Sequence, residues 1–255
     1  MINIMQRETL LNMVSKTPKN NRGSIKHAWV HIDKARALAG LDNEMAAFRA
    51  ITAEEEAATA IIRELKDIGY KNSKILNPRN HTHKTGLWHL LTVVSAFMYE
   101  CGTNDMMKFV VSEGHDELSG KLIISFPSPI PNDDRWVHPD PPLGMSITNE
   151  GKQVAFHKQS RELANNSSAN KLLRLIESEA NIRNQLIYAS PEGIPFVEGP
   201  PLDFIGEREN RVMVLTYVYL LISQHREPQL FVQQCLDAYL IMLEKGNTTD
   251  MHSAL

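Results

Sequence analysis

The residues with the clearest potential for chemistry lie in the stretch Arg183-Asn184-Gln185-Leu186-Ile187-Tyr188, near the end of a long helical pattern. An arginine presents planar donors that bind a phosphate in a fork, and it stays charged at any relevant pH. Asn184 and Tyr188 are four residues apart, so in a helix they share a face. Helix geometry places Arg183 about 140° around the axis from Tyr188, so the two converge only if the helix ends near Tyr188 or a partner chain brings them together.

The candidate catalytic residues are therefore Arg183, Asn184 and Tyr188. A tyrosine with a pKa of about 10 is a poor general base at neutral pH, although it can donate a proton or a hydrogen bond. A structural alternative stays open. Arg183 could pair with Glu179 four residues earlier, and Tyr188 could pack under the loop that follows.

A second group of candidates is His81, His83 and Lys84, in a segment rich in Asn and Lys that we expect to be a loop. In an extended loop, residues two apart point the same way, so His81 and His83 could chelate a metal, with His89 close by on the next helix. No carboxylate in the immediate segment completes such a set, and we predict no metal site. The favoured interpretation is that His81, His83 and Lys84 form a cationic rim for substrate beside Arg183.

The run Glu54-Glu55-Glu56 offers carboxylates on a helix. Successive helical positions fan out over about 200°, so at most two of the three can face inward. An inward glutamate needs a cationic partner because an unpaired buried carboxylate is costly; Glu55 is the one we assign to the substrate-binding group. The alternative is surface charge near a helix N-terminus.

Composition narrows the class of protein. The chain has 255 residues, 42% of them apolar and 22% charged, with a net charge of −3, which argues against non-specific coating of nucleic acid but permits a local basic patch. The two cysteines, Cys101 and Cys235, cannot build a disulfide framework or a cysteine-based zinc site. The N-terminus lacks the pattern of a signal peptide, and the apolar stretches are too short to span a bilayer. We expect a cytoplasmic protein without a cofactor, since no nucleotide-binding or hydrolase fingerprint is present.

Hydrophobic periodicity predicts a mainly α fold with a small inserted antiparallel β-sheet. Residues 1–30 read as an N-terminal segment and basic linker, and 31–255 as a single helical domain with the β insertion at about 106–157. Asp42 is the expected N-cap of a helix that ends at Gly69, either continuous or restarted by a capping box at Thr52. Expected helices cover 44–68, 87–99, 160–188, 209–225 and 228–245, and expected strands 108–112, 121–126, 145–148 and 153–156.

A proline-rich loop over 127–142 holds Trp136, His138 and Asp140. A histidine and an aspartate two apart, next to an aromatic ring, could form a small site. The more common role of such a loop is to pack on its domain, which is the expectation here.

Three segments together resemble the HEPN superfamily of helical-bundle proteins, and within it the abortive-infection V-type phage-resistance family. They are the alanine- and glutamate-rich helix 48–62, the segment 81–87 that leads with His and Lys into a helix, and the arginine-led helix end 183–188 with its proline-rich exit. The resemblance covers roughly residues 30–100 and 160–200. The expected sheet lies outside it.

The resemblance implies an all-helical core that usually dimerises, with the arginine and a histidine of each copy cleaving RNA at the dimer interface without metal. It makes Arg183 the phosphate-binding residue and Asn184 the residue that orients it, and Tyr188 stands where the family has its histidine. We therefore expect a homodimeric, defence- or toxin-type protein that engages RNA and can act as a metal-independent endoribonuclease. The alternative is a non-catalytic scaffold that binds another protein.

Overall fold

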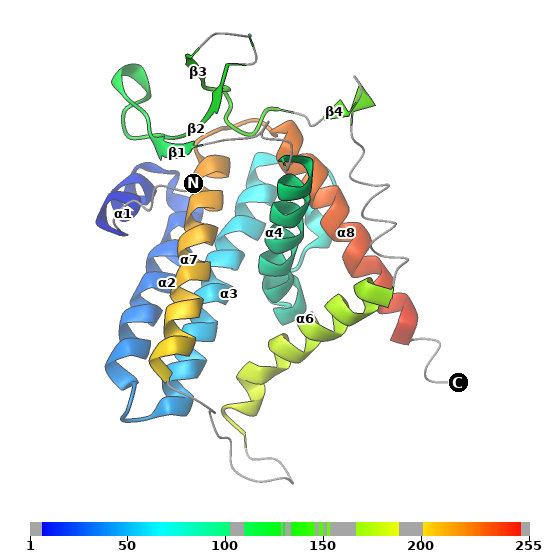
Figure 1. Ribbon diagram of the computed structural model, residues 1–255. Helices are drawn as coiled ribbons and strands as arrows, with labels where there is room; N and C mark the ends of the chain where they lie inside the picture. The colour runs from blue at the N-terminus through cyan, green and yellow to red at the C-terminus, as the bar shows by residue number, and fades with distance from the viewer. Residues whose placement is uncertain are drawn as a thin grey trace.

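Helices build most of the molecule, as Figure 1 shows. The computed structural model describes residues 7–102, 110–128, 130, 134–145, 148–149, 152–153, 167–188 and 201–250. Its helices are α1 (Arg7–Lys16), α2 (Lys19–Leu38), α3 (Asn43–Ile68), α4 (His81–Gly102), α6 (Ser167–Gln185), α7 (Pro201–Ser223) and α8 (Leu230–Asp250). With a three-stranded antiparallel sheet at one end, they confirm the mainly α fold with a small β insertion.

Helix α3 is the centre of the bundle because it packs against α2 and α7, which also contact each other, and it contacts α4 and α6 as well. Small buried side chains allow this close approach, among them Ala46, Ala50, Ala53, Ala57 and Ala60, none of which is exposed to solvent. Their spacing of three and four residues keeps them on one stripe of the helix. The alanine-rich composition of this segment thus determines how near its neighbours can lie.

The ends of α3 confirm the expected caps. The Asp42 side chain accepts a hydrogen bond from the backbone N–H of Met45 at 2.9 Å, and Gly69 adopts a left-handed conformation with φ of 86°. The helix runs without interruption through Thr52, so the capping-box restart is excluded. Glu54 and Glu55 consequently lie in the interior of a long helix, and the surface-charge interpretation is wrong for both because both are buried.

The expectation of a linker before residue 31 is wrong. Residues 19–38 form α2, and α1 packs against α2 and α7. The hydrophobic positions Ile25, Ala28, Trp29 and Ile32 recur at helical spacing and are almost completely buried. The polar and basic residues between them cover the outer face of the helix, which masked the apolar stripe in the composition.

The segment expected to be a loop over 71–85 is also partly helical. A short 3₁₀ turn, η1 (Ser73–Ile75), is followed by α4, which already begins at His81. His81 and Lys84 are therefore on one helical face, and the extended geometry expected for His81 and His83 does not occur. At the other end of the chain, α8 continues through Gly246, where we expected it to stop.

The sheet joins β1 (Val110–Glu113), β2 (Leu122–Pro127) and β3 (Trp136–Val137) in that order, all antiparallel. Between β1 and β2 lies the 3₁₀ turn η2 (Asp116–Leu118). The pair β4 (Thr148–Asn149) and β5 (Lys152–Gln153) forms a separate hairpin. β3 arises within the proline-rich segment expected to be a loop, and the part of the expected 160–188 helix before Ser167 lies outside the described residues.

The sheet caps the end of the bundle at which α7 ends (Figure 1). The backbone N–H of Leu122 donates to Oε1 of Gln224, just beyond the last residue of α7. Among the helices in the described part of the chain, none is long and apolar enough to cross a bilayer.

Candidate functional site

A seam of charged side chains runs between α3, α4, α6 and α7, inside a bundle whose core is mainly apolar. We call it the polar seam. Its members are Arg49, Glu54 and Glu55 of α3, His81, Lys84 and His89 of α4, Glu179 and Arg183 of α6, and Glu207, Arg208 and Arg211 of α7. Charged groups are rarely buried unless they are paired, and a buried charge cluster contributes little to stability. The polar seam is therefore a candidate functional site.

Glu55 anchors the outer half of the seam. Its Oε1 lies 2.6 Å from Nδ1 of His81, and its Oε2 accepts a hydrogen bond from Nζ of Lys84 at 2.8 Å. His81 and Lys84 are three residues apart in the first turn of α4, so both face α3. The carboxylate of Glu55 and the Lys84 side chain are largely buried, whereas the His81 ring is 34% exposed. Glu55 therefore fixes the Nδ1 side of the His81 ring, and the rest of the ring is partly exposed to solvent.

Arg183 lies on the open side of His81. Its Nη1 is 3.4 Å from Nε2 of His81, and its Cζ lies 4.7 Å from the centre of the Phe48 ring. A carboxylate can only accept a hydrogen bond, so Nδ1 of His81 donates to Glu55 and Nε2 faces the guanidinium of Arg183. The order of groups is carboxylate, imidazole, guanidinium.

No carboxylate among the described residues pairs with Arg183, and its buried Nε has no hydrogen-bond partner there. The structural alternative of an Arg183–Glu179 pair is wrong, because Glu179 turns to α7 instead. Stacking on Phe48 holds the guanidinium without neutralising it.

The inner half of the seam joins α6 to α7. Arg208 Nη1 donates to Glu54 at 2.5 Å, and Arg211 Nη1 donates to Glu179 at 3.0 Å. Each arginine also lies 3.5 Å from the other's carboxylate, so that Glu54 and Glu179 are shared. The two arginines are about 5% exposed, and their Nε atoms have no partner in the described structure.

Glu179 is held ionised by this arrangement. Burial alone would raise its pKa, but the His89 ring, the Arg211 hydrogen bond and the charges of Arg208 and Arg211 lower that pKa to about 2. The His89 Nε2 atom is 3.4 Å from Glu179, an ion-pair distance rather than a well-formed hydrogen bond. The carboxylates and guanidinium groups in the inner half of the seam are thus paired with one another.

Cations outnumber carboxylates in the seam by one before any histidine is protonated. The cations are Arg49, Lys84, Arg183, Arg208 and Arg211, and the carboxylates are Glu54, Glu55, Glu179 and Glu207. Arg49 also meets an imidazole, since its Nη1 lies 3.5 Å from Nδ1 of His31. Burial, followed by the charges of His27 and Arg49, lowers the pKa of His31 to about 4, so that ring is neutral at pH 7. The surplus charge remains at the Arg183 end.

The structure brings together four of the residues predicted from the sequence, Arg183, His81, Lys84 and Glu55. The structure does not place His83, Asn184 and Tyr188 beside these four residues. His83 accepts a hydrogen bond from the backbone N–H of Asn77 through Nδ1, while Asn184 is exposed and Tyr188 is 69% exposed just beyond the end of α6. The expected cationic rim therefore lacks His83, and Tyr188 is one turn away from the His81–Arg183 contact.

Sequence reasoning missed Arg208 and Arg211. Their signal was present: two arginines three residues apart open a helix whose remaining length is almost entirely apolar. Arginines at that spacing share a helical face, and in a buried helix that face must meet carboxylates. Phe48 and Trp88 carry no such signal, because their role in stacking on Arg183 and Arg211 depends on tertiary packing.

Within the described residues, no group of three or more His, Cys, Asp or Glu side chains is placed to hold a metal ion. His81 and His83 bind different partners and do not converge. Comparisons with models of known families, with characterised proteins and with solved structures find no match to this chain.

Proposed function

We propose that the outer half of the polar seam is a metal-independent phosphodiester site and that the chain is an endoribonuclease of the HEPN type. The observation that carries this proposal is the Glu55–His81–Arg183 series, in which an oriented imidazole faces an arginine that no described carboxylate neutralises. A carboxylate that fixes one ring nitrogen leaves the other to accept or return a proton. The guanidinium of Arg183, stacked on Phe48 and without a carboxylate partner among the described residues, supplies the positive charge that attracts a phosphate.

The chemistry follows from these three groups. His81 Nε2 takes the proton of a ribose 2′-hydroxyl, whose oxygen attacks the adjacent phosphorus. Arg183 neutralises the charge that develops on the phosphate oxygens. The bond from phosphorus to the 5′-oxygen breaks, that oxygen takes up a proton from solvent, and the products are a 2′,3′-cyclic phosphate and a 5′-hydroxyl. RNA alone provides the 2′-hydroxyl.

This mechanism gives Glu55 and Lys84 supporting roles. Glu55 is a positioning residue, because it reaches the substrate only through His81. Lys84 donates a hydrogen bond to the second oxygen of Glu55 and holds that carboxylate in place. Tyr188 is not required for proton transfer, which accounts for a tyrosine at the position where the resembling family has histidine.

The test is incubation of the purified protein with total RNA and a short oligoribonucleotide in the presence of EDTA. Wild-type protein is expected to cleave both, and Arg183→Ala to lose at least about a hundredfold in rate, the scale of a lost electrostatic stabiliser. Arg174→Ala is the matched control, because Arg174 is an exposed arginine on the same helix. Intact RNA at high protein concentration, or equal cleavage by both variants, would remove the nuclease proposal.

A second candidate is a scaffold that binds a protein, including a second copy of this chain. Apolar side chains around the end of α6 and the start of α7 favour it, since Ile187, Tyr188 and Leu202 are all exposed. Under this candidate, Tyr188→Ser combined with Leu202→Ser reduces the measured molar mass of the assembly, whereas Arg183→Ala changes nothing beyond stability. Sedimentation analysis of the two variants distinguishes the proposals.

A further inference from the structure

The face of the small sheet that points away from the helical bundle carries several apolar side chains, although a solvent-facing surface is usually polar. In β2, Leu122 and Ile124 face the bundle and are buried there, as is Val111 of β1. The alternate residues face outward, and an antiparallel sheet with one covered face ordinarily presents polar residues on the other. Here that face carries Val110 and Ile123, with Trp136 beside them.

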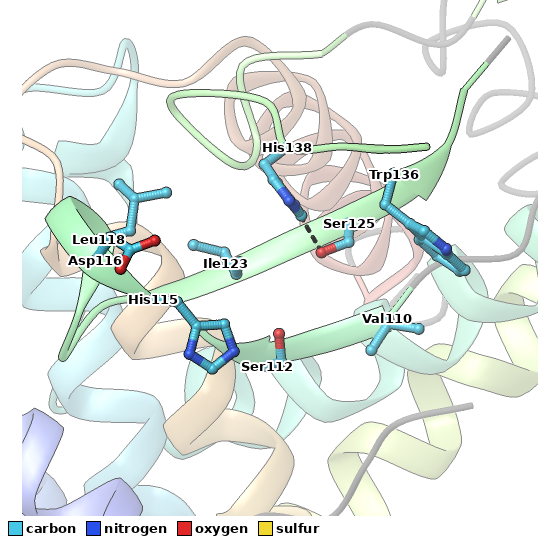
Figure 2. Close-up of a pocket in the computed structure, with 9 residues that line it drawn as sticks. All are labelled: Val110, Ser112, His115, Asp116, Leu118, Ile123, Ser125, Trp136 and His138. Atoms are coloured by element: carbon cyan, nitrogen blue, oxygen red, sulfur yellow. Dashed lines mark hydrogen bonds between the residues drawn. The ribbon is translucent and has the colours of Figure 1, made fainter. Parts of the chain in front are cut away.

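Strand register places the outward side chains in one group. Val110 lies opposite Ser125, Ser112 lies opposite Ile123, and Trp136 lies opposite Pro127. They line a hollow of about 500 Å³ (Figure 2), closed at one end by His115, Asp116 and Leu118 of the β1–β2 connection. This volume falls in the range of small-molecule sites, about 300–1,000 Å³.

Polar groups are fixed within the hollow. Oγ of the buried Ser125 lies 2.8 Å from Nδ1 of His138, which reaches over from the end of β3. Figure 2 shows Trp136 at one end of the hollow and Asp116 at the other, with Ser112 and Ser125 between them. The hollow thus offers a flat ring, hydroxyl and imidazole groups that donate or accept, and one carboxylate that accepts.

We propose that this hollow binds a heteroaromatic base, supplied either by a free nucleoside or by an unpaired base of an RNA strand. The Trp136 indole is 45% exposed and gives a stacking surface. Ser125 and His138, which lie beside Trp136, hydrogen-bond the edge of the base. No lysine or arginine occurs among the described lining residues, so the hollow selects the base and not a phosphate group.

This base site is separate from the polar seam. Arg208 and Arg211 lie in the first half of α7, whereas the sheet contacts Gln224 beyond the end of that helix. Arg211 and Gln224 are 13 positions apart along the chain, which is about 20 Å at the rise of a helix. The proposal of a base site can therefore be tested independently of the proposed cleavage chemistry.

The experiment is calorimetric titration of the full chain with adenosine, guanosine, cytidine and uridine, with single-stranded oligoribonucleotides, and with ribose and inorganic phosphate. We expect at least one base-containing probe to bind and Trp136→Ala to weaken it about tenfold, the scale of a lost stacking contact. Trp136→Phe should retain most of the affinity. Val137→Ala is the matched control, since Val137 is a similarly exposed neighbour on β3. Arg183→Ala should bind the free nucleosides normally, because these probes carry no phosphate for Arg183 to contact.

A second readout needs no variant. A bound base should protect Trp136 from acrylamide quenching. Trp29 is already buried at 1% exposure, and Trp88 is partly buried against Arg211 in the polar seam, so the change in quenching should come from Trp136. Binding of free nucleosides identifies a small-molecule source, and binding of oligoribonucleotides alone identifies a strand; both support the proposal. The proposal is overturned if no base-containing probe binds, or if inorganic phosphate displaces the probe. It is also overturned if Trp136→Ala binds with unchanged affinity and the probe does not protect Trp136 of the wild-type protein from quenching.

Discussion

At the scale of single residues, Glu55 decides what His81 can do. The carboxylate is buried, is bound by Lys84 on one oxygen and contacts the His81 ring on the other. A neutral amide at this position keeps the shape but can also donate a hydrogen bond, which allows the opposite tautomer of His81. The proton-accepting nitrogen would then no longer face Arg183.

Glu55→Gln should therefore lower the single-turnover rate of RNA cleavage by about a hundredfold, within the range of lost general acid–base catalysis. RNA affinity should be nearly unchanged, because Arg183 is untouched. Glu56→Gln, the next residue on α3 and only half-buried, is the control and should cleave normally. A loss of affinity instead of rate in Glu55→Gln would show that Glu55 is merely structural.

Glu179 makes a prediction about acid stability. Its pKa falls from the ordinary 4.5 to about 2 in the folded chain. A lowered carboxylate pKa stabilises the fold above the unfolded pKa, and this contribution is lost as pH falls from about 4.5 to about 2. The shift corresponds to about 3 kcal/mol at most.

Urea unfolding between pH 5 and pH 2.5 tests this prediction. In Glu179→Gln, the free energy of unfolding should be lower at pH 5 and should change less with pH than in wild type. Equal pH dependence of the two proteins would contradict the lowered pKa.

At the scale of elements, α4 is positioned by a glycine. A Cβ on Gly86 would collide with the hydroxyl of Tyr239 on α8, and that hydroxyl donates to the backbone carbonyl of His83 at 2.7 Å. Tyr239 is fully buried, so it has no free space in which to move. The absence of a side chain at Gly86 thus sets how α8 holds the first turns of α4, which carry His81 and Lys84.

Gly86→Ala should destabilise the fold by about 1–3 kcal/mol through overpacking, and it should also reduce cleavage because His81 shifts. Gly23→Ala in α2 is the matched control, since a Cβ added at Gly23 would meet nothing within 4 Å. That control should leave stability equal or raise it by up to about 1 kcal/mol through helix propensity. Thermal unfolding of both variants gives the comparison, and a neutral Gly86→Ala would show that α4 is not clamped there.

Much of the element pattern could be predicted from the sequence, and the errors have physical causes. Asp42 and Gly69 bound α3 as expected because capping depends on local geometry. The start of α4 at His81 was missed because its first turn is polar and looks like a loop. α2 was missed because basic residues on the exposed side dilute the stripe that contains Ile25 and Trp29.

At the scale of the whole molecule, the chain has a net charge of −3, whereas the polar seam within it has one more cation than carboxylates. The polar seam is built from four helices, and no spacing within one helix predicts which carboxylates meet which arginines. The sequence therefore singled out Arg183, His81, Lys84 and Glu55 but not their pairing. It also assigned a catalytic role to Tyr188, which stays a prediction, since that side chain is exposed just beyond the end of α6.

The small surplus of cations in the polar seam predicts how the affinity for RNA depends on salt concentration. RNA binding to the seam should weaken as salt rises, because only a few cations, Arg183 and its neighbours, contact phosphate. The slope of log affinity against log salt should be shallow and should fall by about one in Arg183→Ala, as expected for one lost phosphate contact. An unchanged slope in that variant would mean that RNA binds elsewhere.

The central claim is that His81 and Arg183 together carry out transesterification at a phosphodiester without metal. The most direct measurement is end-group analysis of a defined oligoribonucleotide after single-turnover incubation in EDTA with wild type and with His81→Ala. We expect fragments ending in a 2′,3′-cyclic phosphate and a 5′-hydroxyl for wild type, and intact substrate for His81→Ala. Intact substrate with wild type, fragments with a 3′-hydroxyl, or undiminished cleavage by His81→Ala would contradict it.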